Sequence, residues 1–283
     1  MIKNVLLITK NGLLLVLLQI NHKFMDGNNN SSIWVAVSIL IAGVLIGGAV
    51  FFTRDSGGDS SNALMVQYNN FMRTTNAKFA SIRTNAQTAD ITTIRPPNAS
   101  DYILGSLDSP IIIVEYSDTE CPFCSVLHDN LKEVIEIYDG KVSWVYRHLP
   151  LVSLHRKAVI EAHALECAGS VGGNQKFWDY TNILYEMTNG NDGLDLNQLP
   201  VIAEMVGLNV SEFNLCMSEE RHVADIEEDY REILDATAGQ VGTPYNVIFT
   251  ANGDRLVASG ALPVANWISI IDQILSQLEQ SAE

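Results

Sequence analysis

Apolar and polar positions in the C-terminal two thirds of the chain change period repeatedly, which predicts alternating strands and helices. The run at residues 110–118 (PIIIVEYSD) is rich in β-branched residues and is typical of a buried strand. Residues 126–138 repeat apolar side chains at helical spacing. After an Asp-Gly turn, residues 141–148 alternate between apolar and polar side chains, which indicates a second strand.

A helical block follows, and the chain closes with two strands and a helix. Helical periodicity continues over about residues 152–238, with polar and glycine-rich breaks. The segments 245–250 and 255–259 predict strands joined by a hairpin turn, and residues 264–278 predict the last helix. Without the block, this is the element order of thioredoxin. We therefore expect an α/β thioredoxin fold over residues 91–283, with an inserted helical domain.

The N-terminal part differs in composition. Residues 33–52 form an uncharged apolar run of 20 residues, long enough to cross a bilayer as a helix. A cleaved signal peptide is the alternative, but Phe51-Phe52-Thr53 is a poor cleavage site. We expect a single uncleaved transmembrane anchor, with residues 1–32 cytoplasmic because three lysines precede it. Residues 53–90 predict a polar linker and a stalk helix.

The first 24 residues fit this plan poorly. Two apolar runs, residues 5–8 and 13–20, are each too short to cross a membrane, and together they predict only a poor second helix. Met25 opens an ordinary polar segment before the anchor. Our hypothesis is that Met25 is the biological start, which N-terminal mass analysis of the native protein would test.

Composition and charge narrow the functional classes. Hydrophobic residues make up 47% of the chain, which excludes wholesale disorder. The formal net charge is −16, and it arises from the part after the anchor. A nucleic-acid-binding protein needs a basic face to neutralise phosphates, so the charge argues against a nucleic-acid partner.

The strongest chemical signal is Cys121-Pro122-Phe123-Cys124, which follows the first predicted strand and opens the next helix. At a helix N-terminus, the unpaired N–H groups and the dipole stabilise a thiolate. The i, i+3 spacing places both sulfurs on one face, close enough to bridge. Pro122 fits the first turn because its missing N–H costs nothing there. We expect Cys121 to be the exposed nucleophile and Cys124 the buried resolving thiol.

Two other interpretations of this pair stay open. A structural disulfide is one of them. Zinc is the other, but zinc sites usually need four ligands, and the remaining cysteines, Cys167 and Cys216, are isolated in the sequence. We therefore expect a redox-active pair with no metal and no other cofactor.

Thr243-Pro244 is the second candidate element, lying between the helical block and the next strand. A cis peptide bond here would bring the loop beside the cysteine pair and leave backbone groups free to pair with a peptide. An ordinary trans proline at the first residue of a strand is the alternative.

Four separated motifs resemble the DsbA family of thioredoxin-fold disulfide oxidoreductases. They occur in the family's order: VEYSDTECPFC at 114–124, YRHLPL at 146–151, KFW at 176–178 and GQVGTP at 239–244. The resemblance covers about residues 91–283 and implies the same fold as the periodicity. It also implies oxidation of reduced, unfolded exported proteins by an extracytoplasmic domain. Reoxidation would then come from a membrane partner of the quinone-linked or VKOR-like kind.

The chain departs from the family at Phe123, where the best-known periplasmic members carry histidine. Phenylalanine offers neither a donor nor a positive charge to a thiolate, so we expect a less stabilised thiolate and a less oxidising couple.

Glu115 interrupts the apolar strand before the cysteine pair. The resemblance favours a buried carboxyl near Cys124, where it would accept the proton of the resolving thiol or raise thiol pKa values. A glutamate at the strand edge facing solvent is the alternative, and the alternation of the run does not decide between them.

Cys167 and Cys216 both fall in the helical block, and related proteins carry cysteines in similar settings. We interpret them as a structural disulfide, which fits an oxidising compartment. Two free buried thiols are the alternative. The isolated histidines His148, His155 and His163 are interpreted as surface or core residues, and His128, one turn beyond Cys124, as a surface residue.

The leading prediction is a membrane-anchored protein disulfide oxidoreductase. A reductase or isomerase would use the same residues with a reducing partner, and the stalk helix would offer an isomerase a dimerisation face. A non-catalytic binding module or a copper chaperone is a third possibility, which metal content and substrate trapping would expose.

Overall fold

The structure is a computed structural model that describes residues 5–8, 14–17, 61–84 and 86–282. It divides into two compact units, Met1–Asp59 and Ser60–Glu283. In the first unit, β1 (Val5–Ile8) pairs antiparallel with β2 (Leu14–Leu17). The two short apolar runs therefore form a hairpin, and the expectation that they share a helix is wrong.

The anchor predicted at residues 33–52 and the start hypothesis at Met25 lie outside the described residues. Among the residues that are described, no helix combines the length and the apolar character needed to cross a membrane.

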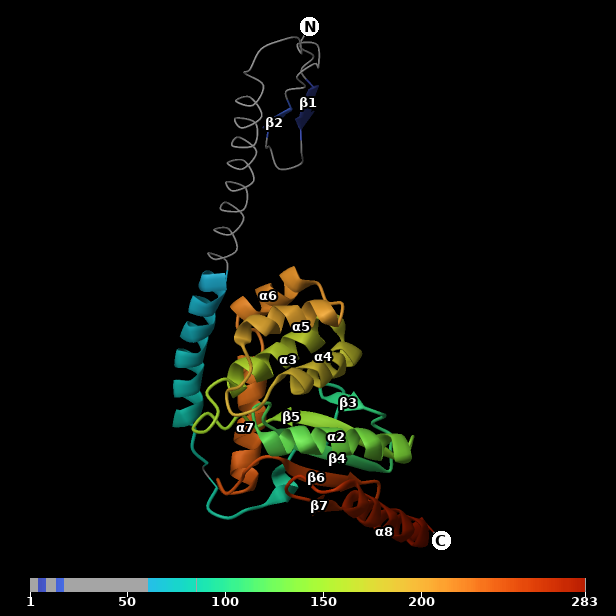
Figure 1. The fold of residues 1–283 in the computed structure, drawn as a ribbon. Helices are drawn as coiled ribbons and strands as arrows, with labels where there is room; N and C mark the ends of the chain where they lie inside the picture. The colour runs from blue at the N-terminus through green and yellow to red at the C-terminus, as the bar shows by residue number, and fades with distance from the viewer. Residues whose placement is uncertain (1–4, 9–13, 18–60, 85, 283) are drawn as a thin grey trace, which may run out of the picture. The chain divides into compact units, whose positions relative to one another are not determined.

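A five-stranded sheet with strand order β3-β5-β4-β6-β7 organises the second unit (Figure 1). The central strands β4 and β5 run parallel, and the other neighbours are antiparallel. This is the thioredoxin-like arrangement expected from the sequence, with one additional edge strand. The strands are β3 (Tyr102–Leu104), β4 (Ile111–Ser117), β5 (Val142–His148), β6 (Tyr245–Thr250) and β7 (Arg255–Val257).

Helices cover both faces of this sheet, which explains why every residue of β4 is buried and most are apolar. Alternate residues of β4 face opposite sides. Ile111 and Ile113 belong to the larger core, which includes side chains of α2 (Pro122–Ile137) and α8 (Val264–Ala282). Ile112, Val114 and Tyr116 join a second core, which includes side chains of α7 (Val223–Ala236). A strand buried on both faces carries no alternation in its sequence.

The inserted helical domain follows β5. Its helices are α3 (Ala158–Gly172), α4 (Asn174–Met187), the 3-10 turn η2 (Leu196–Gln198), α5 (Leu199–Met205) and α6 (Val210–Ser218). The sequence predicted an insertion to about residue 238, but α7 packs Ile233 and Ala236 against the sheet. The insertion proper therefore consists of α3 to α6.

Residues 61–81 are helical, which is shorter than the stalk helix expected to residue 89. The helix buries Tyr68, Phe71 and Phe79 within its own unit. The Phe71 ring stacks on His163 of α3 with centroids 5.3 Å apart. Because this apolar face is already covered by the same chain, it is not available for the dimerisation considered above. A short 3-10 turn, η1 (Ile91–Thr93), leads into the sheet.

Arg147 of β5 ties the sheet to its surroundings. Its guanidinium is fully buried and donates to both carboxylate oxygens of Asp101, at 2.9 and 3.0 Å. It also donates to Glu232 of α7 at 3.1 Å and to the Arg95 carbonyl at 3.0 Å. A buried cation needs such a complete set of partners, because desolvating it alone costs several kcal/mol. Through Arg147, the YRHLPL motif thus has a structural role: it joins β5 to Asp101 and to α7.

Candidate active site

The cysteine pair lies where β4 ends and α2 begins. The Cys121 N–H donates to the Asp118 carbonyl at 3.0 Å, which turns the chain, and Cys121 is the N-cap residue of α2. Pro122 follows in the first turn, so the cysteine motif opens the helix as expected from the sequence. Cys121 is only 6% exposed, so the expectation of an exposed nucleophile is wrong, and Cys124, one turn further, is fully buried. Both are free thiols in this structure.

The Cys121 sulfur is surrounded by groups that favour its thiolate. The Cys124 side chain hydrogen-bonds to it and is the largest influence, followed by the Thr243 side chain and the backbone N–H groups of Cys124 and Phe123. Together these outweigh partial burial and lower the pKa of Cys121 to about 6. A thiol with such a pKa is mostly ionised at neutral pH and is a good leaving group.

Cys124 shows the opposite behaviour. Burial, the hydrogen bond with Cys121 and the nearby Glu115 carboxyl raise the pKa of Cys124 well above its ordinary value. The Asp118 N–H approaches its sulfur at 3.5 Å, which only partly offsets burial. The two sulfurs are therefore chemically distinct: Cys121 carries the charge and Cys124 retains the proton.

The Thr243–Pro244 peptide bond is cis and lies immediately before β6. The loop faces the cysteine pair, and the Cys121 sulfur is 3.6 Å from the Thr243 carbonyl oxygen. The Thr243 hydroxyl is buried and has no hydrogen-bond partner among the described groups, so it is free to donate to a Cys121 thiolate. Residues 122 positions apart in the sequence thus form one site.

Glu115 points into the core below the cysteines, on the same face of β4 as Ile111 and Ile113. It is fully buried, and one carboxyl oxygen accepts a hydrogen bond from Trp144 Nε1 at 3.0 Å. The other oxygen has no partner within the described part of the chain. Burial raises the pKa of Glu115 to about 8, so the group is neutral near pH 7. The alternative of a solvent-facing glutamate is excluded by this position.

His128, one turn beyond Cys124, was interpreted as a surface residue, and this interpretation is wrong. It is buried, and its Nε2 lies 2.7 Å from the Asn182 side-chain oxygen. Its ring packs edge-on against Trp144. Burial lowers the pKa of His128 to about 4, so it remains neutral. Its role is packing below the site.

Two buried carboxyls on the insertion side of the pair were not predicted from the sequence. Asp118 is buried and accepts from the Leu151 N–H at 2.7 Å and from His155 Nδ1 at 2.9 Å. Glu120, directly before Cys121, is also buried and accepts from the Gly193 N–H at 3.1 Å. The only signal in the sequence was their position beside the cysteines, since acidic residues before a helix are ordinary.

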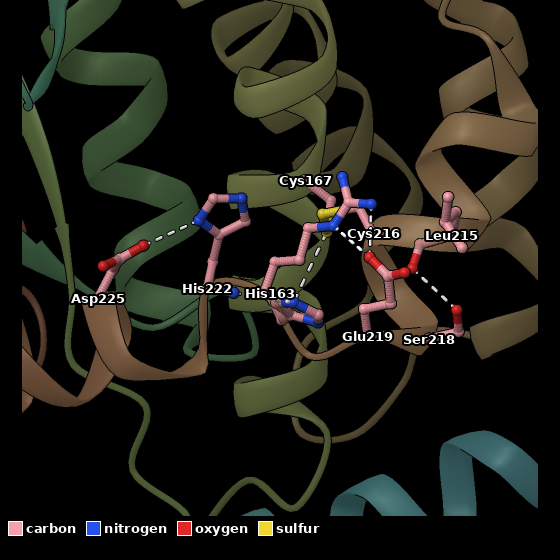
Figure 2. The surroundings of a disulfide bond; sticks show 9 residues. His163, Cys167, Leu215, Cys216, Ser218, Glu219, His222 and Asp225 are labelled. Atoms are coloured by element: carbon pink, nitrogen blue, oxygen red, sulfur yellow. Dashed lines mark hydrogen bonds and ion pairs between the residues drawn. A yellow bond between two sulfur atoms is a disulfide. The ribbon is translucent and has the colours of Figure 1, made fainter.

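Cys167 of α3 and Cys216 of α6 form a disulfide with Cα atoms 5.8 Å apart (Figure 2). Both residues are fully buried. His163 lies one turn before Cys167, with its Nε2 3.6 Å from the sulfur, and burial lowers the pKa of His163 to about 3. The bonded sulfurs offer no thiolate to a metal ion. The disulfide links two helices of the insertion, away from the Cys121–Cys124 pair in the sequence.

Comparison with known proteins places this site in a family. A family model described as thioredoxin matches residues 98–272, which is more than half of the chain. The chain belongs to the thioredoxin family. Within that family its fold is DsbA-like, as the solved structures show.

Pseudomonas aeruginosa DsbA2 is 28% identical to the chain, covering 62% of it and 96% of that structure, with a TM-score of 0.52. Wolbachia pipientis α-DsbA1 is 22% identical, covering 66% of the chain and 96% of that structure, with a TM-score of 0.56. Both matches cover nearly all of the solved protein. The DsbA-like part is therefore about two thirds of this thioredoxin-family chain.

Curated relatives carry a different name. Na(+)/H(+) antiporter NhaA 1 of Mycolicibacterium vanbaalenii is 32% identical over 114 residues, which cover 40% of this chain and 18% of that protein. The chain spans about a fifth of the length of the first curated relatives it matches. The match thus concerns a small part of those proteins.

Proposed function

We propose that the thioredoxin-family domain is a protein thiol–disulfide oxidoreductase that introduces disulfides into exported proteins. The observation that carries this proposal is the pair of opposite pKa shifts at Cys121 and Cys124, beside the cis Thr243–Pro244 loop. A structural disulfide would not need one acidic thiol beside one proton-retaining thiol.

The reaction begins with the oxidised Cys121–Cys124 pair. A substrate thiolate attacks the Cys121 sulfur, and the bond to Cys124 breaks, so that Cys124 leaves as a thiolate and takes up a proton. The substrate's second thiolate then attacks the substrate sulfur of this mixed disulfide, and Cys121 leaves as a stable thiolate. Two electrons have passed from the substrate to the enzyme, which a partner disulfide must reoxidise.

The Cys121 pKa favours oxidation of substrates over their reduction. At pH 7 a thiol with a pKa of about 6 is thiolate to the extent of about ten to one. This ionisation stabilises the reduced enzyme by about 1.4 kcal/mol, equivalent to about 30 mV in a two-electron couple. Phe123 offers this thiolate no charge, so we expect a less oxidising couple than that of DsbA.

Exposed apolar side chains near the pair suit an unfolded polypeptide substrate. Phe123, between the two cysteines in the sequence, is 66% exposed, and Leu154 is 68% exposed next to His155, which contacts the carboxylate of Asp118. Apolar exposure of this kind favours segments that folded proteins keep inside.

We further propose that the domain works outside the cytoplasm, held by an anchor at residues 33–52 and reoxidised by a membrane partner of the quinone-linked or VKOR-like kind. The Cys167–Cys216 disulfide supports an oxidising compartment. The length and composition of the apolar segment support the anchor.

The reduction potential of the full chain in glutathione buffers tests the direction of the reaction. A value near or above ~−180 mV supports the oxidase, whereas a value near ~−270 mV would assign a reductase or isomerase. Trapping tests the chemistry: Cys124→Ala should accumulate mixed disulfides on non-reducing gels, and the additional change Cys121→Ala should abolish them. No mixed disulfide with Cys124→Ala would leave only a binding module.

A further inference from the structure

A histidine lies on the insertion side of the nucleophile, in a position that the reaction described above does not use. His155 belongs to the segment between β5 and α3, and only 5% of it is exposed. Its Nδ1 is 2.9 Å from an oxygen of Asp118. Asp118 in turn is bound to the cysteine turn, because its carbonyl accepts the Cys121 N–H at 3.0 Å and its N–H approaches Cys124 at 3.5 Å.

The groups that face His155 favour a positive charge. The hydrogen bond to Asp118 is the largest influence, and the charges of Asp118, Cys121 and Glu120 add to it, so the pKa of His155 is raised despite burial. Cys121 is thus electrostatically coupled to His155. Phe123, inside the cysteine motif, has no charge to offer.

The two basic residues that follow His155 in the sequence are engaged elsewhere and do not take the place of its positive charge. The Arg156 guanidinium lies 3.5 Å from the Asp192 carboxylate, and the Lys157 ammonium donates to the Asp192 carbonyl at 2.6 Å. On α3, Glu161 is fully buried, and burial together with Glu120 raises its pKa well above the ordinary value. Glu161 therefore holds its proton more strongly than an exposed glutamate does.

We propose that His155, held by Asp118, is a positioning residue whose imidazolium is the charge partner of the Cys121 thiolate. The inference deepens the proposed function and rests on it, because a stabilised thiolate makes the dithiol form the favoured product. The geometry that supports it is the chain of contacts from the His155 ring, through Asp118, to the turn that holds Cys121. The coupling is reciprocal, so each group raises or lowers the pKa of the other by the same amount.

The redox state of the pair therefore controls the histidine. The Cys121–Cys124 disulfide carries no charge, whereas the reduced pair carries the Cys121 thiolate at neutral pH. We expect the pKa of His155 to be higher in the reduced protein than in the oxidised protein. An opposite charge at close range shifts a pKa by about one unit, which corresponds to a tenfold change in the protonation equilibrium.

The experiment is an NMR titration of histidine ring signals in the full chain, in the oxidised and reduced states. Cys121→Ala supplies the uncharged state a second time, without any reductant that might open the Cys167–Cys216 disulfide. In parallel, thiolate absorbance near 240 nm gives the Cys121 pKa in the wild type and in His155→Gln. We expect two pKa shifts of equal size and opposite sign. The pKa of His155 falls when the thiolate is absent, and the pKa of Cys121 rises when the histidine is absent.

His222→Gln is the matched control. His222 also pairs with an aspartate, because its Nδ1 lies 2.8 Å from Asp225 (Figure 2). The His222→Gln variant should leave the Cys121 pKa unchanged. A His155 pKa that is the same with and without the thiolate overturns the proposal, even if His155→Gln lowers stability.

The proposal and the proposed function fail in different ways. The titration uses no substrate, so redox coupling of His155 can be present in a protein that oxidises nothing. Conversely, the protein could oxidise a reduced test substrate while the His155 pKa is the same with and without the thiolate. The proposed function would then stand and the role of His155 would be refuted.

Discussion

Replacing Glu115 by glutamine should change the pH dependence of stability by a large and calculable amount. The carboxyl is fully buried, and burial raises its pKa from 4.5 to about 8. Between these pH values the folded protein keeps a proton that the unfolded chain releases. The stability that goes with this proton is complete below pH 4.5 and is lost as the pH rises through 8.

The magnitude follows from the two pKa values. From pH 4.5 to pH 7 the loss spans 2.5 pKa units of proton linkage, or about 3 kcal/mol. Glutamine keeps an oxygen that can accept from Trp144 and has nearly the same shape, but it has no proton to lose. The free energy of unfolding of Glu115→Gln, relative to the wild type, should therefore rise by about 3 kcal/mol over this range.

Urea unfolding of the oxidised proteins at several pH values measures this difference. The oxidised state is chosen because the Cys121–Cys124 disulfide does not titrate. Glu133→Gln, at an exposed position on α2, is the control for the chemical change and should leave the pH profile unaltered. If the two glutamine variants show the same profile, Glu115 is ionised in the folded protein and the burial argument is refuted.

Three further changes test other parts of the structure. Thr243→Val removes the hydroxyl available to the thiolate and should raise the pKa of Cys121, measured by thiolate absorbance; an unchanged value would assign that effect to the backbone. Replacing both Cys167 and Cys216 by alanine removes the disulfide that joins residues 49 positions apart and so frees the unfolded chain. The free energy of unfolding should fall by about 4 kcal/mol. Arg147→Met leaves its buried carboxylate partners unpaired and should cost about 3–5 kcal/mol in denaturant unfolding, whereas a neutral effect would show that they relax to solvent.

The sequence predicted most of the fold because its periodicities were long and well separated. The apolar strand at 111–117 and the alternating strand at 142–148 both form as expected. The strand at 102–104 was not predicted, since its three residues are only half-buried and make no pattern. Helix α7 was assigned to the insertion because amphipathic periodicity shows that a face is covered, and not which element covers it.

In the candidate site, too, some residues could be predicted from the sequence and others could not. A cysteine motif between a strand and a helix is a local signal, so the positions of Cys121 and Cys124 followed from the sequence. The contact between Asp118 and His155 could not be predicted, because the two residues are 37 positions apart and a single histidine makes no sequence pattern. Glu115 was ambiguous for a related reason: a strand buried on both faces gives no alternation from which to orient one side chain.

The strand order has a consequence for the emerging polypeptide. Strand β4 lies between β5, which is made soon afterwards, and β6, whose residues are made much later: Ile111 pairs with Thr250. The loop that faces Cys121 precedes β6, so during synthesis both cysteines leave the ribosome before Thr243 exists. Domains fold as units, and the non-local pairing of β4 with β6 must await the last part of the chain. The part of the Cys121 environment that comes from Thr243 is therefore missing from the nascent protein until translation of the domain is nearly complete.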